Sequence, residues 1–269
     1  AMSVGAVLGL SGATMQGILR NPLAEPGVMG VSSCAALGAV IALYFGFANH
    51  SWWLLSVFGV GGSLLSVLLL FALAGRRSSQ LSLVLSGVAL SAVAASLIAV
   101  ALNFAPNPYA ISEIVYWLMG SFLNRTIDEF WLALPLFILG TIIILWRSPV
   151  LSALSFGEET AISLGFDVHR EKIWLIIGIA LVVGAAVSIS GAIGFVGLVV
   201  PHLMRPLVNA DPRKLLWVSA LAGVAFMLLA DIAVQLISTS MEIKIGVITS
   251  LVGGPFFFFL IYKLRSVTT

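Results

Sequence analysis

The residue types that most often carry enzyme chemistry are few in this sequence and widely separated. It has three histidines, His50, His169 and His202, and one cysteine, Cys34, which lies in an apolar run where a small packing residue is typical. Neither a Walker A phosphate loop nor an HExxH zinc motif occurs. We therefore expect no cofactor and no bound metal in this chain.

Two small groups of polar residues nevertheless remain candidates. The segment Gly30 to Ser33 faintly resembles the nucleophile segment of an intramembrane serine protease, with His202 as a conceivable base. Small residues in apolar helices more typically mark helix packing, so we favour a chain that is not an enzyme. Asp231 is the one acid deep in an apolar run, and it is either a transport residue or a hydrogen-bond partner of Gln235. Glu25 is expected to fix a tight turn.

The composition identifies lipid as the main solvent of this chain. Hydrophobic residues make up 60% and charged residues 9%, whereas soluble proteins contain about 25% charged residues. The formal charge of +2 gives no argument for a nucleic-acid partner. We predict an all-α, polytopic transmembrane helical bundle.

Nine apolar stretches approach the length of about 20 residues that a helix needs to cross a bilayer. The seventh is short and bounded by glycines, so it is either a full span or a half-helix. The stretches are continuously apolar, which excludes the alternating strands of a barrel. They are Met2–Leu19, Val28–Phe47, Trp52–Ala74, Leu81–Phe104, Phe130–Trp146, Ile173–Ser190, Ala192–Met204, Leu215–Ile237 and Ile245–Tyr262.

Threading the chain through these spans places eleven of its thirteen basic residues on one side, which predicts that this side is the cytoplasm. The C-terminus is then cytoplasmic, and Ala1 lies outside, directly against a helix. We expect at least one further span before Ala1. The eleven residues are Arg20, Arg76, Arg77, Arg147, Arg170, Lys172, Arg205, Arg213, Lys214, Lys263 and Arg265, with Arg125 and Lys244 on the other side.

Two loops and two glycine patterns interrupt the apolar pattern. The external loop Pro106–Arg125 suits a short interfacial helix, and the cytoplasmic loop 148–172 contains a predicted short helix, Glu158 to Leu164, between glycine hinges. Gly5 and Gly9 form a GxxxG motif that is typical of close helix packing. The GxxGxxG run that begins at Gly191 indicates either packing and a kink or a discontinuous helix beside a transport pathway.

Seven segments together resemble the FecCD family of importer permeases, which serve iron-siderophores, haem and cobalamin. They occur in the order of the family's own blocks and span nearly the whole chain. The segments are Ser11–Val40, Leu83–Ser91, Tyr116–Phe122, Leu154–Gly165, Ser190–Arg205, Leu228–Ile232 and Ile245–Ile261.

The resemblance implies a type II ABC importer permease in the bacterial inner membrane. Such a permease has ten spans and works as a homodimer with two cytoplasmic ATP-binding subunits and a periplasmic or lipid-anchored substrate-binding protein. Nine spans are seen here, and the family's first span and the arginine-rich external segment after it are missing. Residues 1–269 would then be one transmembrane permease domain, with residues 148–172 as its cytoplasmic coupling loop.

The resemblance also assigns roles to individual residues. Gln235 stands where cobalamin permeases have an external arginine, and Lys244 replaces a usual proline, so both are candidate contacts with the binding protein. A cytoplasmic gate is implied at Gln80, Leu81 and Ser82. The contact with the ATPase is implied at Gly157, Glu158, Ala161, Leu164 and Gly165.

We expect an importer of iron-siderophore-type chelates that is driven by a separate ATPase subunit. Haem or cobalamin is the alternative cargo in the same machinery. An ion-coupled secondary transporter is the alternative from another class, although it would need more intramembrane acids than Asp231.

Overall fold

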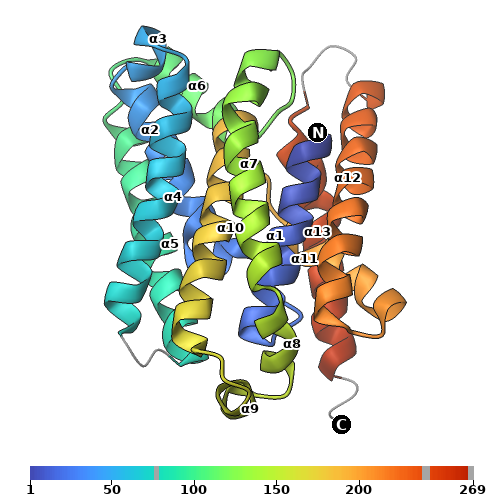
Figure 1. The fold of residues 1–269 in the computed structure, drawn as a ribbon. Coiled ribbons are helices and arrows are strands. Elements are labelled where there is room, and N and C mark those ends of the chain that lie inside the picture. The colour runs from blue at the N-terminus through green and yellow to red at the C-terminus, as the bar shows by residue number, and fades with distance from the viewer. Residues whose placement is uncertain (76–78, 238–242, 266–269) are drawn as a thin grey trace.

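The computed structural model describes residues 1–75, 79–237 and 243–265, which form a bundle of helices without a strand (Figure 1). Six of these helices are long and apolar enough to cross a membrane, and three shorter apolar helices accompany them. The long ones are α1 (Met2–Leu19), α4 (Trp53–Ala74), α5 (Gln80–Asn103), α7 (Ile127–Arg147), α10 (Val168–Ser190) and α12 (Pro212–Ile237). The shorter ones are α2 (Val31–Tyr44), α11 (Val196–Met204) and the apolar stretch Ile245–Leu260 of α13 (Ile245–Arg265).

Each of the nine predicted spans overlaps one of these nine helices, so the all-α polytopic fold is confirmed. The remaining elements are short. They are η1 (Pro26–Met29), α3 (Phe47–His50), α6 (Pro108–Leu118), α8 (Pro149–Ser155), α9 (Glu158–Ser163) and η2 (Arg205–Val208).

Polar residues cap the starts of five of the helices. The side chain of each N-cap residue accepts a hydrogen bond from a backbone N–H in the first turn. For α7 the cap is a complete capping box, in which the Glu129 carboxylate also accepts a hydrogen bond from the Thr126 N–H. The five N-caps are Ser79 of α5, Asn107 of α6, Thr126 of α7, Asp167 of α10 and Asp211 of α12.

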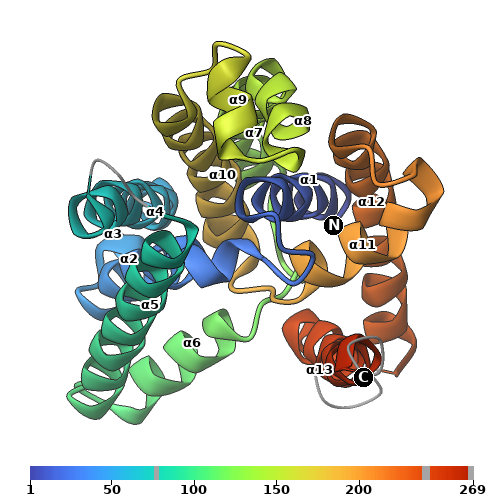
Figure 2. The ribbon, with the colours of Figure 1, turned by 90° about the horizontal axis from the view of Figure 1, so that it is seen from below.

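Two helices form the centre of the bundle. The apolar stretches of α1 and α10 are 78% and 83% buried inside the protein, against 17% to 33% for α4, α5, α7 and α12. Helix α10 packs on α7, α4, α2 and α1, while α1 also packs on α11 and α12 (Figure 2). The outer helices expose large apolar side chains such as Leu68, Leu85 and Leu221. Exposed apolar faces of this kind suit contact with lipid or with another membrane protein.

Close backbone contacts attach α1 to its neighbours. A Cβ atom on Gly5 would meet the carbonyl oxygen of Gly223, and one on Gly9 would meet the carbonyl oxygen of Ser219. Both partners lie on α12. The packing interpretation of the GxxxG motif is therefore confirmed.

Two predicted spans are shorter in the structure than in the sequence prediction. The second begins at Val31 instead of Val28, because Gly30 adopts a left-handed conformation (φ +76°) that separates η1 from α2. The seventh becomes helical only at Val196, after a non-helical stretch that starts at Gly191. Helix α11 is thus a half-helix of nine residues.

The ends of α1 and α7 and the starts of α10 and α12 lie together at the bottom of Figure 1, near the end of α13. The basic residues at these ends belong to the predicted cytoplasmic set, and we call this side the basic end. Arg76 and Arg77 of that set lie outside the described residues, and so do the side chains of Lys263 and Arg265.

Candidate functional site

The predicted coupling loop contains a short helix between two glycines, as expected. Helix α9 ends at Ser163, one residue before the predicted Leu164. Gly157 and Gly165 have φ values of +116° and +90°, which side-chain-bearing residues rarely adopt. Figure 1 shows α9 at the extreme basic end of the molecule. The loop therefore turns sharply at both glycines and presents α9 beyond the bundle.

A buried ion pair attaches α9 to the central helix α10. Nζ of Lys172 lies 2.7 Å from Oε1 of Glu158, and the Lys172 side chain is only 2% exposed. Ala161 is fully buried, and its carbonyl accepts a hydrogen bond from the Phe166 N–H. Sequence reasoning used Lys172 only to orient the chain and missed this contact, because a lysine before an apolar run usually lies in solvent.

Three large apolar side chains of the same loop are exposed, next to exposed polar residues such as Glu159 and Thr160. Phe156, Ile162 and Leu164 are 78%, 60% and 63% exposed. We call these three side chains the apolar patch, since exposed large apolar groups often mark protein contacts.

Helix α10 connects this loop to the opposite end of the molecule. Near the basic end, Arg147 of α7 pairs with Glu171 at 2.9 Å. In the middle, the Ser63 hydroxyl of α4 donates to the carbonyl of Ala180. At the far end, the backbone N–H of Ser121 donates to the carbonyl of Ser190 at 2.8 Å. Helix α10 is thus held at both ends and in the middle, as a rigid element would be.

The predicted gate residues lie at the start of α5, at the basic end. Leu81 is 68% exposed, and the Ser82 hydroxyl donates to the carbonyl of Ala74. With its amide oxygen turned toward Arg20, Gln80 accepts bonds from Nε and Nη2 of that arginine at 2.8 and 3.2 Å. A Cβ atom on Gly157 would lie 3.9 Å from Nη1 of the same arginine. Arg20 therefore lies between the predicted gate and the predicted coupling loop, a position that the sequence did not reveal.

The two predicted binding-protein contacts lie at the opposite end. The Gln235 amide donates to Oδ2 of Asp231 at 3.1 Å, which bears out the hydrogen-bond interpretation of that acid. Asp231 and Gln235 line a cavity of about 130 Å³ together with Ser121 and Ile243. The Lys244 ammonium, one residue beyond Ile243, lies 5.5 Å from the centre of the Tyr116 ring.

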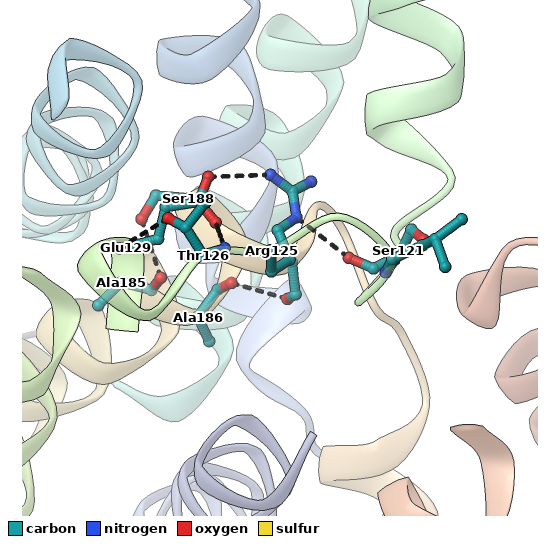
Figure 3. A network of polar contacts seen from close by, with 9 residues as sticks. Ser121, Arg125, Thr126, Glu129, Ala185, Ala186 and Ser188 are labelled. Carbon is teal, nitrogen blue, oxygen red and sulfur yellow. Dashed lines mark hydrogen bonds and ion pairs between the residues drawn. The ribbon is translucent and has the colours of Figure 1, made fainter. Parts of the chain in front are cut away.

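The only other basic residue predicted on this side is held within the chain. Nη1 of Arg125 lies 3.5 Å from Oε1 of Glu129, and its Nε donates to the carbonyl of Ser121. Figure 3 shows this arginine beside the capping box of Thr126 and Glu129. Arg125 thus fastens the start of α7 to the loop that precedes it.

The break before α11 meets the turn before η1 inside the bundle. Phe195 has a left-handed φ of +68°. Glu25, Ser32 and Phe195 line a cavity of about 190 Å³. Sequence reasoning expected only a local role for Glu25 and missed its place in this cavity, because nothing in the spacing brings the two segments together. His202, the conceivable base for Ser32, packs edge-on against Phe256 of α13.

Comparisons with known proteins agree over nearly the whole chain. The model of the FecCD transport family matches residues 1–263. Vitamin B12 import system permease proteins BtuC from Salmonella paratyphi A and Salmonella typhi are both 38% identical over 263 residues. These matches cover 97% of this chain and 79% of each relative.

Two solved structures share the fold. A chain described as an inward-facing conformation of a metal-chelate type ABC transporter is 35% identical and superposes with a TM-score of 0.90. The match covers 97% of this chain and 83% of that one. PsaBC from Streptococcus pneumoniae is 17% identical, with a TM-score of 0.65 over 96% of this chain and 87% of its own, which indicates the fold alone.

Proposed function

This chain belongs to the FecCD transport family and is a membrane permease of the ABC importer type; from this premise we propose that its cargo is an iron-siderophore-type chelate. The observation that carries the proposal is the likeness to the metal-chelate type transporter, with a TM-score of 0.90 and 35% identity over 97% of the chain. A bulky chelate needs a wide path between helices, and movement of packed helices can open one.

Cobalamin is the second candidate cargo, and the 38% identity to the vitamin B12 permeases favours it. Against it stands Gln235, at the position where the family resemblance implies an external arginine in cobalamin permeases. In this chain Gln235 is bonded to Asp231. A neutral amide in that place would contact the binding protein differently from a cation, so we rank cobalamin below ferric chelates.

The proposed assembly is a homodimer of this permease in the bacterial inner membrane, with two ATP-binding subunits and one substrate-binding protein. The ATPase subunits would meet the basic end, where α13 ends, and that end would face the cytoplasm. The exposed apolar patch of Phe156, Ile162 and Leu164 has the chemistry of a surface that enters a protein cleft.

The proposed mechanism transmits movement through the two contacts found at the loop. The Glu158–Lys172 ion pair would couple displacement of α9 to α10. Arg20, which lies beside Gly157 and is bonded to Gln80, would couple the same displacement to the gate. Both contacts are short-range, so a small movement of α9 changes them directly. ATP binding and hydrolysis would thereby alternate the permease between inward-open and outward-open packings.

The cargo is tested by the ligand of the partner binding protein. Tryptophan quenching of that protein should give a dissociation constant for a ferric siderophore at least about tenfold below those for haem and cobalamin, a difference of about 1.4 kcal/mol. Vesicles with the permease, ATPase and binding protein should then take up the chelate only when ATP is present. Tighter binding of cobalamin would show that cobalamin is the cargo instead of a ferric chelate. Uptake without ATP would support a secondary transporter.

Lys244 provides a test of the proposed docking of the binding protein at the end opposite the coupling loop. Changing Lys244 to glutamate should slow association of the binding protein about tenfold at low salt, because it reverses a charge that would steer an acidic partner. The difference should shrink at high salt, where exposed charges are screened. Surface plasmon resonance with the permease in nanodiscs measures both rates. Lys214→Glu, at the basic end, is the matched control, and equal effects of the two variants would refute the docking site.

A further inference from the structure

A third cavity lies at the basic end, beside the predicted gate, since its lining residue Arg20 also contacts Gln80. It has a volume of about 240 Å³ and lies between the end of α1, α8, η2 and the start of α12. Figure 2, seen from this end, shows α1 between α8 and α12. Its polar lining comes from Gln16, Arg20, Ser155 and Arg205, and its other lining residues are small or apolar. No carboxylate lines it in the part of the chain that the structure describes.

Each arginine of this cavity is held by a glutamine instead of an acid. Nη2 of Arg205 donates to Oε1 of Gln16 at 2.8 Å. The Gln16 side chain is itself 1% exposed, and its Nε2 donates to the carbonyl of Leu198. This second bond fixes the amide with its oxygen toward Arg205. With the Gln80 amide turned so that its oxygen faces Arg20, that oxygen holds Arg20 in the same way. A neutral amide orients a guanidinium group but leaves its charge in place.

Three other basic residues at this end have acidic partners close by. The N···O distances are 2.9 Å for Arg147 to Glu171, 2.7 Å for Lys172 to Glu158 and 3.0 Å for Arg170 to Asp167. Within the described ranges 1–75, 79–237 and 243–265, Arg20 and Arg205 form no such pair. These two positive charges, unlike those three, therefore have no acidic partner among the described residues.

The guanidinium group of Arg205 also has unused donor capacity. Its Nε is buried and has no hydrogen-bond partner within the described residues. Burial lowers the pKa of Arg205, as desolvation of an unpaired cation does. Asp211, which follows a residue of the lining, accepts hydrogen bonds from the backbone N–H groups of Arg213 and Lys214 at the start of α12. An anionic hydrogen-bond acceptor from outside the chain would compensate the positive charge of Arg205 and provide a partner for its Nε.

We propose that this cavity binds a phosphate group, supplied by the headgroup of an anionic phospholipid or by free phosphate. The planar guanidinium group matches phosphate oxygens and forms strong charge-assisted hydrogen bonds with them. Basic pockets between helices at the cytoplasmic surface are suited to anionic headgroups. Leu203, Leu207 and Trp217 on the adjoining α11, η2 and α12 are 48%, 72% and 59% exposed, and they offer apolar surface to acyl chains.

Native mass spectrometry and thermal unfolding of the detergent-solubilised chain test the proposal with three additions: phosphatidylglycerol, phosphatidylcholine and inorganic phosphate. We expect phosphatidylglycerol to bind and to raise the unfolding temperature more than phosphatidylcholine does. Arg205→Gln should weaken this binding about tenfold, since it removes charge-assisted hydrogen bonds. Arg213→Gln, which changes an arginine at the same end but outside the cavity lining, is the matched control and should bind as the unaltered chain does.

The three additions distinguish the two sources of the phosphate. A response to inorganic phosphate alone that Arg205→Gln removes would assign the site to free phosphate. Arg20→Gln changes an exposed side chain and provides the same test if Arg205→Gln fails to fold. Two outcomes would overturn the proposal: equal binding by Arg20→Gln, Arg213→Gln and the unaltered chain, or no response to either anion. If both anions fail and an acidic segment of the ATPase subunit crosslinks to the cavity instead, the charges serve protein docking and the proposal is also wrong.

Discussion

Replacing Glu158 with alanine should destabilise the protein by about 3 kcal/mol and abolish stimulation of the partner ATPase. The change removes the carboxylate that lies 2.7 Å from Nζ of Lys172 and leaves an ammonium group that is 2% exposed without its acid. Removing one partner of a buried ion pair typically costs about 3–5 kcal/mol, and the 33% exposure of Glu158 places this pair at the lower end. Thermal unfolding in detergent and ATPase assays in nanodiscs measure the two effects.

Two further variants separate stability from coupling. Lys172→Met leaves Glu158 able to turn toward water, so it should cost about 1 kcal/mol or less. The double variant Glu158→Ala with Lys172→Met removes both charges and should recover most of the lost stability, as replacing a buried pair with apolar groups often does.

Both of these stable variants should still fail to stimulate ATP hydrolysis if the ion pair transmits movement from α9 to α10. A charge exchange, Glu158→Lys with Lys172→Glu, should restore part of the stimulation. Full stimulation by Lys172→Met would show that α9 moves α10 without the ion pair, and the proposed transmission would be wrong.

Changing Gly12 to valine should prevent the bundle from forming, with a loss of at least about 3 kcal/mol. A Cβ atom at Gly12 would meet the backbone oxygen and Cα of Gly197, at the start of the half-helix α11. Backbone atoms have no alternative rotamer, so α1 and α11 would have to separate. Both helices are also fixed to α12. The fraction of monodisperse protein on size exclusion and the unfolding temperature measure this effect.

Gly61 is the matched control for Gly12, since it also lies within a long apolar helix. Nothing lies within 4 Å of a Cβ atom built there, because this part of α4 faces outward. Gly61→Ala should therefore leave the fold intact and raise stability by up to about 1 kcal/mol, since alanine favours the helix over the unfolded chain. Equal behaviour of Gly12→Val and Gly61→Ala would refute the close contact between α1 and α11.

The position and nature of the long elements could be predicted from the sequence because they depend on local composition. Continuous apolar runs predicted all nine helices that pack as the bundle, and glycines predicted both hinges of α9. The starts of α2 and α11 were placed too early, since the residues after Val28 and Ala192 are as apolar as the helices themselves. Hydropathy carries no information about backbone conformation. The left-handed φ values at Gly30 and Phe195 end the apolar segments that precede α2 and α11, so the helices begin only after these residues.

By itself, the sequence determined that this chain is a helical membrane permease of a known family, because hydrophobicity, glycine hinges and motif order are properties of neighbouring residues. Only the tertiary structure decided which polar groups meet. The Glu158–Lys172 pair, the contact of Arg20 with Gln80 and the pairing of Arg205 with Gln16 each join separate elements. Such contacts depend on how the helices cross and at what depth their ends lie. The packing of α1 and α10 at the centre of the bundle determines the crossing of the helices and the depth of their ends. This packing depends on several distant segments, so no single stretch of sequence encodes it.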